Sequence, residues 1–154
     1  MPELPEVETI RRGLSNKILN KKIVKVEVQK PRLLRNKLSY FKSITHGNSV
    51  VSIARIGKLL IFNLADNNFL LIHLKMTGQL IYSFNDDIVA GGHNFPPLEK
   101  LPNKYSHIIF TFSDGSFLFF NDMRQFGYLQ IVDDIGQKKL EIDLVLNQVV
   151  MILP

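Results

Sequence analysis

Short apolar runs of strand length, separated by a few turn-forming residues, fill most of the sequence after position 20. The clearest pair covers residues 107–112 and 116–121, which Ser113-Asp114-Gly115 joins as a predicted hairpin. A second tight turn is predicted at Ala65-Asp66-Asn67-Asn68. The other predicted strands cover residues 24–28, 50–55, 59–64, 69–74, 79–82 and 127–132. Closely spaced strands of this kind favour an antiparallel two-layer β-sandwich over repeated βαβ units.

The N-terminal segment has a helical period instead. Its apolar residues follow one helical face between about positions 5 and 19, at Val7, Ile10, Leu14 and Ile18. We expect this helix to pack against the sandwich, so the fold class is mainly β with α. Residues 31–41 fit either a loop or a short helix, and the proline- and glycine-containing residues 84–104 are predicted to form a long loop.

Size and composition indicate one globular unit. The 154 residues are 45% hydrophobic, which is enough to bury a single core. No apolar run approaches the roughly 18–20 residues of a membrane span, and Glu3, Glu6 and Glu8 argue against a signal peptide, so a cytoplasmic protein without membrane contact is expected. Cysteine is absent, which excludes disulfides and cysteine-based zinc sites in this chain.

Charge is unevenly distributed along the chain. Residues 1–60 carry 13 Lys and Arg against 4 Asp and Glu, whereas residues 61–154 carry 6 against 10, which gives net charges of +9 and −4. A one-sided basic half is typical of a phosphate-binding surface. The alternative is a solvated basic face, in which Lys21, Lys22 and Lys25 only promote solubility.

Pro2 is the first candidate for chemistry. A small second residue permits removal of Met1, which leaves Pro2 as a free secondary amine. An α-amino group titrates near neutrality, at about 7.7–8.0, so a useful fraction is nucleophilic at cellular pH. Attack of a secondary amine on an aldehyde-level carbon forms a cationic iminium, which favours elimination at the neighbouring C–H bond. The nearby acids have a plainer explanation, because carboxylates complement the positive end of a helix dipole.

Four ordered segments resemble one enzyme family. The N-terminus reads PELPEVETIRRGL, which is similar to the start of formamidopyrimidine-DNA glycosylases, bacterial enzymes that excise oxidised purines such as 8-oxoguanine and then cleave the strand. The later segments are RIGKLL at 55–60, HLKMTG at 73–78 (family pattern H-L-x-M-[ST]-G) and NDMRQFG at 121–127 (family pattern N-D-x-R-x-F-G). Related endonuclease VIII enzymes usually begin P-E-G-P-E, so Leu4 favours the purine-directed branch.

The resemblance implies a role for eight residues. The catalytic set is Pro2 as nucleophile, Glu3 as general acid on the ribose ring oxygen, Glu6 as orienting group and Lys58 as phosphate contact and catalytic aid. The DNA-binding set is His73 on a phosphate, with Met76, Arg124 and Phe126 filling the space that a flipped nucleotide leaves and Arg124 meeting the orphaned cytosine. Without the resemblance, Lys58 reads as a surface strand-end lysine, and Met76 and His73 read as core residues.

The implied activity is a base-excision-repair DNA glycosylase and AP lyase. It would act on damaged double-stranded DNA through a proline Schiff base with β,δ-elimination, as a nucleoid-associated monomer with no metal or cofactor in this chain. The alternative within the family is a non-catalytic DNA-binding fragment or decaying gene product. An unrelated basic β-sandwich that binds RNA or a protein would leave the four motif matches to coincidence.

The resemblance ends near residue 134. Family members continue into a helix-two-turn-helix domain and a four-cysteine zinc finger, which this sequence does not contain. The domain prediction is therefore a catalytic N-terminal domain at 1–134, followed by a truncated linker and frameshifted tail at 135–154. Back-translation from Val145 to Pro154 with one added G gives G-P-E-P-G-G-D-D-F-T, close to the expected linker L-G-P-E-P. We hypothesise a frameshift from about Val145, either in the gene or through a sequencing error.

Overall fold

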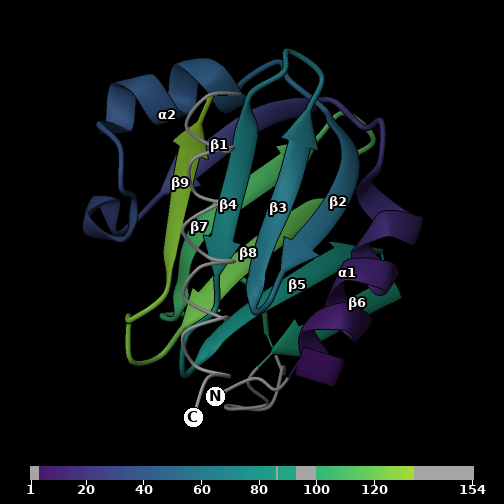
Figure 1. Ribbon diagram of the computed structural model, residues 1–154, viewed down its shortest axis with the longest axis vertical. Coiled ribbons are helices and arrows are strands. Elements are labelled where there is room, and N and C mark those ends of the chain that lie inside the picture. The colour runs from purple at the N-terminus through teal and green to yellow at the C-terminus, as the bar shows by residue number, and fades with distance from the viewer. Residues whose placement is uncertain (1–3, 86, 93–99, 134–154) are drawn as a thin grey trace, which may run out of the picture.

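The computed structural model describes residues 4–85, 87–92 and 100–133, and its strands form two antiparallel sheets (Figure 1). The five-stranded sheet has the order β1-β7-β8-β5-β6 and is built from β1 (Ile23–Val28), β5 (Gly78–Phe84), β6 (Asp87–Gly92), β7 (Ser106–Phe112) and β8 (Phe117–Asp122). The four-stranded sheet has the order β2-β3-β4-β9 and is built from β2 (Val50–Ile56), β3 (Leu59–Leu64), β4 (Phe69–His73) and β9 (Tyr128–Val132). The predicted antiparallel two-layer sandwich is confirmed.

Two helices close the open sides of this sandwich. Helix α1 (Leu4–Ile18) contacts β2 and β6, which are the edge strands on one side, and α2 (Leu38–Thr45) contacts the opposite edge strands β1 and β9 (Figure 1). The predicted helical face is confirmed, because Val7, Ile10, Leu14 and Ile18 are all buried. No helix within the described part of the chain is long and apolar enough to cross a membrane.

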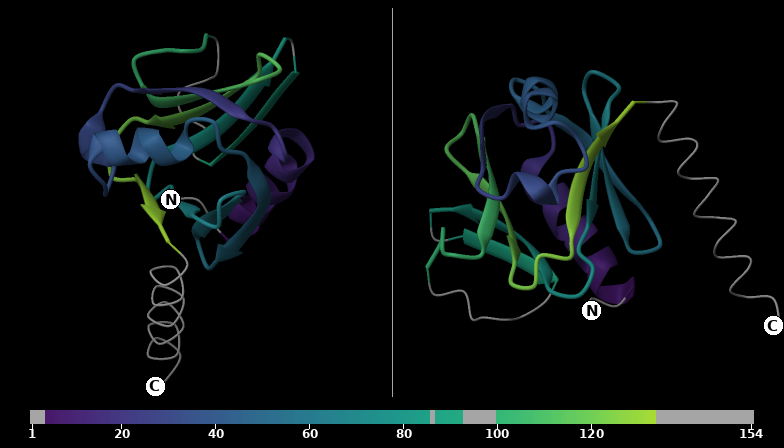
Figure 2. Two further views of the ribbon diagram at one scale, coloured as in Figure 1. Left: turned by 90° about the horizontal axis from the view of Figure 1, so that it is seen from above. Right: turned by 90° about the vertical axis from the view of Figure 1, so that its left-hand side faces the viewer.

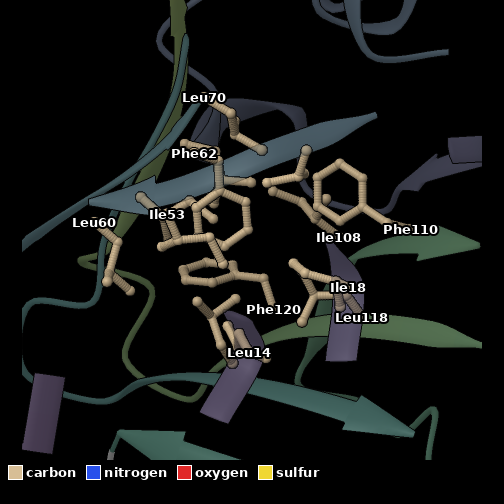
Figure 3. Close-up of a cluster of buried hydrophobic side chains, with 14 of the residues drawn as sticks. Leu14, Ile18, Ile53, Leu60, Phe62, Leu70, Ile108, Phe110, Leu118 and Phe120 are labelled. Atoms are coloured by element: carbon tan, nitrogen blue, oxygen red, sulfur yellow. The ribbon is translucent and has the colours of Figure 1, made fainter. Parts of the chain in front are cut away.

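The core lies between the two sheets and is almost entirely aliphatic and aromatic. Leu14 and Ile18 of α1 meet side chains from both sheets in it (Figure 3). The four-stranded sheet contributes Ile53, Leu60, Phe62 and Leu70, and the five-stranded sheet contributes Ile108, Phe110, Leu118 and Phe120. Because α1 is fixed by buried residues along its length, the position of its first turn relative to the strands is fixed as well.

The structure differs from the sequence-based assignment in one segment and decides between the two alternatives in another. Residues 87–92, predicted as loop, form the edge strand β6, which pairs with β5 from Phe84↔Asp87 to Gln79↔Gly92. Strand β6 is held by backbone hydrogen bonds to β5, and these do not require alternating apolar and polar residues in β6. The sequence pattern therefore did not predict this strand. The ambiguous segment 31–41 contains the 3-10 helix η1 (Pro31–Leu33) and the start of α2.

One end of the sandwich carries the elements that the sequence motifs occupy. The start of α1, the β2–β3 turn, the β4–β5 turn and the β8–β9 loop all lie at the lower end in Figure 1, and the right-hand view of Figure 2 shows the same grouping. The fold therefore brings segments from far apart in the sequence to one rim.

Candidate functional site

The described site residues all lie on this rim. Glu6 is exposed in the first turn of α1, Lys58 lies in the β2–β3 turn, His73 ends β4, Met76 lies in the β4–β5 turn, and Arg124 and Phe126 lie in the β8–β9 loop. Pro2 and Glu3 lie outside the described residues, as does the whole segment 135–154. No hydrogen bond or ion pair among the described residues joins Glu6 to the other five.

The β8–β9 loop takes its shape from the carboxylate of Asp122. This fully buried side chain accepts the backbone N–H of Gln125 at 3.0 Å on Oδ1 and that of Gly127 at 2.8 Å on Oδ2. Gln125 has a left-handed backbone with φ of +60°, which the bond to Asp122 helps to hold. Arg124 and Phe126, on either side of Gln125, are thereby directed out of the sheet.

Thr77 joins this loop to the β4–β5 turn. Its hydroxyl donates to Oδ1 of Asp122 at 2.5 Å and accepts the backbone N–H of Arg124 at 2.9 Å. Met76 immediately precedes Thr77, so one hydroxyl fixes the turn that carries Met76 and the loop that carries Arg124. The structure therefore brings Met76, Arg124 and Phe126 together as parts of one hydrogen-bonded unit.

Two glycines allow the close backbone approach that this unit needs. A Cβ on Gly78 would lie 2.5 Å from the carbonyl oxygen of Leu74, and a Cβ on Gly127 would lie 2.7 Å from that of His73. Both distances are shorter than real Cβ contacts. A larger residue at position 78 would distort the β4–β5 turn, and one at position 127 would push the β8–β9 loop away from the end of β4.

The side chains that leave this unit place two exposed apolar groups beside a cation. Met76 is 42% exposed and Phe126 is 53% exposed, although apolar side chains of this size are mostly buried. The guanidinium of Arg124 lies 5.1 Å from the centre of the Phe126 ring, a cation–π contact that keeps a cation beside the exposed aromatic. This part of the rim therefore presents apolar groups and hydrogen-bond donors to the same binding partner.

His73 is a neutral hydrogen-bond donor surrounded by cations. Burial, followed by the positive charges of Lys75, Arg35 and Lys58, lowers its pKa to about 4. Its Nδ1 accepts the backbone N–H of Lys75 at 3.1 Å, so the proton of the neutral ring is on Nε2. Lys58 is therefore close enough to His73 for its charge to act on the ring, and the phosphate contacts of both residues stay predictions.

Several residues around His73 were not singled out from the sequence. Tyr128 stacks on the His73 ring at 5.7 Å between ring centres, and the Arg35 guanidinium lies 3.4 Å from the centre of the Tyr128 ring. Arg35 falls in the segment 31–41, which had no clear pattern. An arginine followed much later by a tyrosine carries no local signal, and only the fold places the two together.

Glu8 is a further residue to which the sequence analysis assigned no catalytic or DNA-binding role. Its carboxylate pairs with Arg11 at 2.6 Å and Arg12 at 2.8 Å on α1, and with Arg55 at 2.9 Å at the end of β2. Hydrogen bonds from Arg11 and then Arg55 hold the pKa of Glu8 well below its ordinary value. Arg55 also donates to the carbonyl of Gly57 at 3.2 Å, so Glu8 ties the start of α1 to the turn that carries Lys58.

Metal ligands do not gather in the described ranges, where no three His, Asp or Glu side chains are grouped as ligands would be.

Comparisons of the sequence and the fold with known proteins all point to one protein family. Residues 1–129 match the model of the formamidopyrimidine-DNA glycosylase N-terminal domain. The chain is similar to the formamidopyrimidine-DNA glycosylase of Pelotomaculum thermopropionicum, at 41% identity over 133 residues, which are 86% of this chain and 44% of that protein. The corresponding Enterococcus faecalis protein is 38% identical over 133 residues, 86% of this chain and 42% of the relative.

A solved structure shows the same fold. The Lactococcus lactis Fpg protein in complex with abasic-site DNA superposes with a TM-score of 0.77 at 29% identity, over 92% of this chain and 48% of that one. This chain therefore spans slightly less than half the length of the relatives that it matches.

Proposed function

Because the chain belongs to the formamidopyrimidine-DNA glycosylase family, through its N-terminal domain, we propose that it is the catalytic part of a DNA glycosylase and AP lyase that removes oxidised purines in base-excision repair. The observation that carries this proposal is the rim unit in which Thr77 and Asp122 hold Met76, Arg124 and Phe126 together. Its partner would be damaged double-stranded DNA, bound by a nucleoid-associated monomer.

The rim unit suits a duplex from which one nucleotide has been extruded. Exposed Met76 and Phe126 offer apolar surface that can occupy the vacated stack, since an inserted side chain offsets part of the cost of unstacking. The guanidinium of Arg124, beside Phe126, can donate to the acceptors of the unpaired cytosine. A surface that only bound the DNA backbone would have no need of two exposed apolar side chains here.

The proposed chemistry begins at Pro2, once Met1 has been removed. The Pro2 nitrogen attacks C1′ and displaces the base, which leaves with a proton, while the nitrogen gives up its own proton. Glu3 then protonates the ribose ring oxygen, the C1′–O4′ bond breaks, and the opened sugar is held as an iminium. Loss of the 2′ proton expels the 3′ phosphate, and a second elimination expels the 5′ phosphate. Glu6, exposed in the first turn of α1, would orient waters at this site. The proposal assigns no metal or cofactor to these steps.

Phosphate contact is assigned to Lys58 and His73. The neutral His73 ring can donate from Nε2 while its Nδ1 is occupied by Lys75, and Lys58 adds charge close by. Phosphate oxygens accept both kinds of donor, and neutralising them releases counterions, which favours binding. The ties from Glu8 to Arg55 and from Arg55 to Gly57 support the turn that positions Lys58.

Borohydride trapping tests the proposal directly. Protein whose intact mass shows that Met1 has been removed is incubated with an 8-oxoguanine·cytosine duplex and borohydride, and a covalent protein–DNA adduct is expected. Pro2→Gly and Glu3→Gln should reduce the adduct, and a chain with an uncleaved N-terminal extension should form none, because its Pro2 nitrogen is an amide. DNA binding without an adduct would instead identify a non-catalytic DNA-binding fragment, which the chain's short span relative to its relatives also allows.

A further inference from the structure

The ring of Tyr128 is the centre of a cationic cluster that the proposed catalytic steps do not use. The Arg35 guanidinium lies 3.4 Å from the ring centre, the Lys75 ammonium lies 5.9 Å from it, and the His73 ring stacks on it. We call these four residues the Tyr128 platform. They come from three separate parts of the chain, the segment after η1, the end of β4 with its following turn, and the start of β9.

The backbone fixes Arg35 in this cluster. Its N–H donates to the carbonyl of Leu129 at 2.9 Å, and Leu34 forms a parallel bridge with the same residue. Asn36 then makes two hydrogen bonds with the backbone of Ile131, at 3.0 and 2.6 Å. Arg35 is therefore held over Tyr128 before any ligand arrives, which lowers the entropic cost of using its guanidinium.

Among the described residues, no ion pair neutralises the positive charges of the platform. Ion pairs between described residues occupy most cations of α1, of β1 and of the segment between them, as in Lys17 with Asp87, Lys21 with Asp114 and Lys25 with Glu27. None of these recorded ion pairs involves Arg35, Lys58 or Lys75. A guanidinium stacked on a ring keeps the N–H groups of its edge available, which is the arrangement that binds phosphate oxygens.

We propose that Arg35 and Lys75 bind a backbone phosphate of DNA at the Tyr128 platform, beside the contact assigned to His73. This inference rests on the proposed function and extends it, because it adds a phosphate contact from a segment outside all four sequence motifs. Tyr128 acts as a positioning residue that orients the guanidinium. The competing interpretation is that the stack only fastens the segment 31–36 to β9.

The salt dependence of DNA binding separates these two roles. The 154-residue chain is titrated with a duplex that contains a tetrahydrofuran abasic analogue opposite cytosine, and anisotropy gives the dissociation constant over a series of KCl concentrations. Each phosphate contact contributes a slope of about −0.9 to the plot of log affinity against log salt. Arg35→Gln and Lys75→Asn should each make the slope shallower by about that amount, whereas Arg35→Lys should retain most of it.

Lys42→Gln is the matched control. Lys42 is an exposed lysine on α2, at the opposite end of the sandwich from the rim, and its removal should leave the slope unchanged (Figure 1). Unchanged slopes in both platform variants, equal losses in Lys42→Gln, or no binding by the wild-type chain would each overturn the inference. Thermal melting checks folding, and if Arg35→Gln does not fold, the left-handed position of Lys75 tolerates asparagine and that variant decides.

The outcome is independent of the trapping experiment. Trapping with unchanged platform slopes would reject this phosphate contact and leave the proposed lyase in place. Shallower slopes without trapping would reject the lyase and leave a DNA-binding platform.

Discussion

Two carboxylates organise this rim, and they do so by different physical means. Asp122 is fully buried and binds neutral donors, the Thr77 hydroxyl and the backbone N–H groups of Gln125 and Gly127. Glu8 is partly exposed and binds three guanidinium groups, from Arg11, Arg12 and Arg55. The first shapes the loop that connects β8 of one sheet to β9 of the other, and the second ties a helix to a neighbouring turn.

The difference implies that one part of the rim has a fixed backbone conformation and another part can shift. A buried carboxylate with every oxygen occupied specifies one backbone path, because each lost bond leaves a buried donor without a partner. A surface carboxylate among arginines is screened by water and salt, so it restrains α1 against Lys58 more weakly. We therefore expect the void-filling unit to be rigid and the spacing between α1 and the β2–β3 turn to respond to solution conditions.

The largest effect is expected for Asp122→Asn. The amide presents an NH₂ group where one carboxylate oxygen accepts hydrogen bonds, so at least one buried donor loses its partner. The free energy of unfolding should fall by about 2–4 kcal/mol. Urea unfolding followed by far-UV circular dichroism measures the change.

Asp87→Asn is the matched control, since Asp87 forms an exposed ion pair with Lys17. Its loss should cost less than about 1 kcal/mol. Equal costs for the two substitutions would remove the distinction between a buried organising carboxylate and a surface ion pair.

A smaller effect is expected for Gly127→Ala, which tests whether close packing contributes to the Asp122 unit. The added Cβ would meet the carbonyl oxygen of His73 at 2.7 Å and Oδ2 of Asp122 at 2.9 Å. Overpacking of this kind costs about 1–3 kcal/mol, and the displaced loop should weaken binding to abasic-analogue DNA measured by anisotropy.

Gly115→Ala provides a comparable loss of stability elsewhere. Gly115 has a φ of +89° with open space around it, so alanine costs about 1–2 kcal/mol through backbone strain alone. Its hairpin lies away from the rim, and DNA binding should be retained. If Gly115→Ala weakens DNA binding as much as Gly127→Ala does, the conformation of the β8–β9 loop does not determine the DNA affinity.

Much of the fold could be predicted because its signals are local. Helix α1 shows a single apolar face, and the hairpin of β7 and β8 shows two apolar runs around a turn. Strand β6 was missed because its place depends on pairing with β5 rather than on its own pattern. Helix α2 was only partly anticipated, since part of it falls in the segment that fitted loop and helix equally well.

The residues of the candidate site also divide into those that local sequence motifs predict and those that only the fold brings together. Lys58, His73, Met76, Arg124 and Phe126 were found through motif resemblance, and their catalytic and DNA-binding roles stay predictions. Asp122 stood inside a recognised motif without an assigned role, because its function is to shape backbone that the sequence does not display. Glu8, Arg35 and Tyr128 act through contacts across the fold, which no local spacing encodes.

The smallest effect is expected for Glu8→Gln, and it depends on conditions. The pKa of Glu8 is held well below its ordinary value of about 4.5, so its stabilising contribution is present above that pH and declines as pH falls below it. The melting temperature of the wild type should exceed that of Glu8→Gln at pH 7, and the gap should narrow as pH drops from about 4.5 or when NaCl rises to about 1 M. The gap for Asp122→Asn should survive the same salt, because buried hydrogen bonds are not screened. If the difference in melting temperature between the wild type and Glu8→Gln does not change with salt, the arginine contacts of Glu8 are as protected from solvent as the hydrogen bonds of Asp122. The contrast between the two carboxylates would then fail.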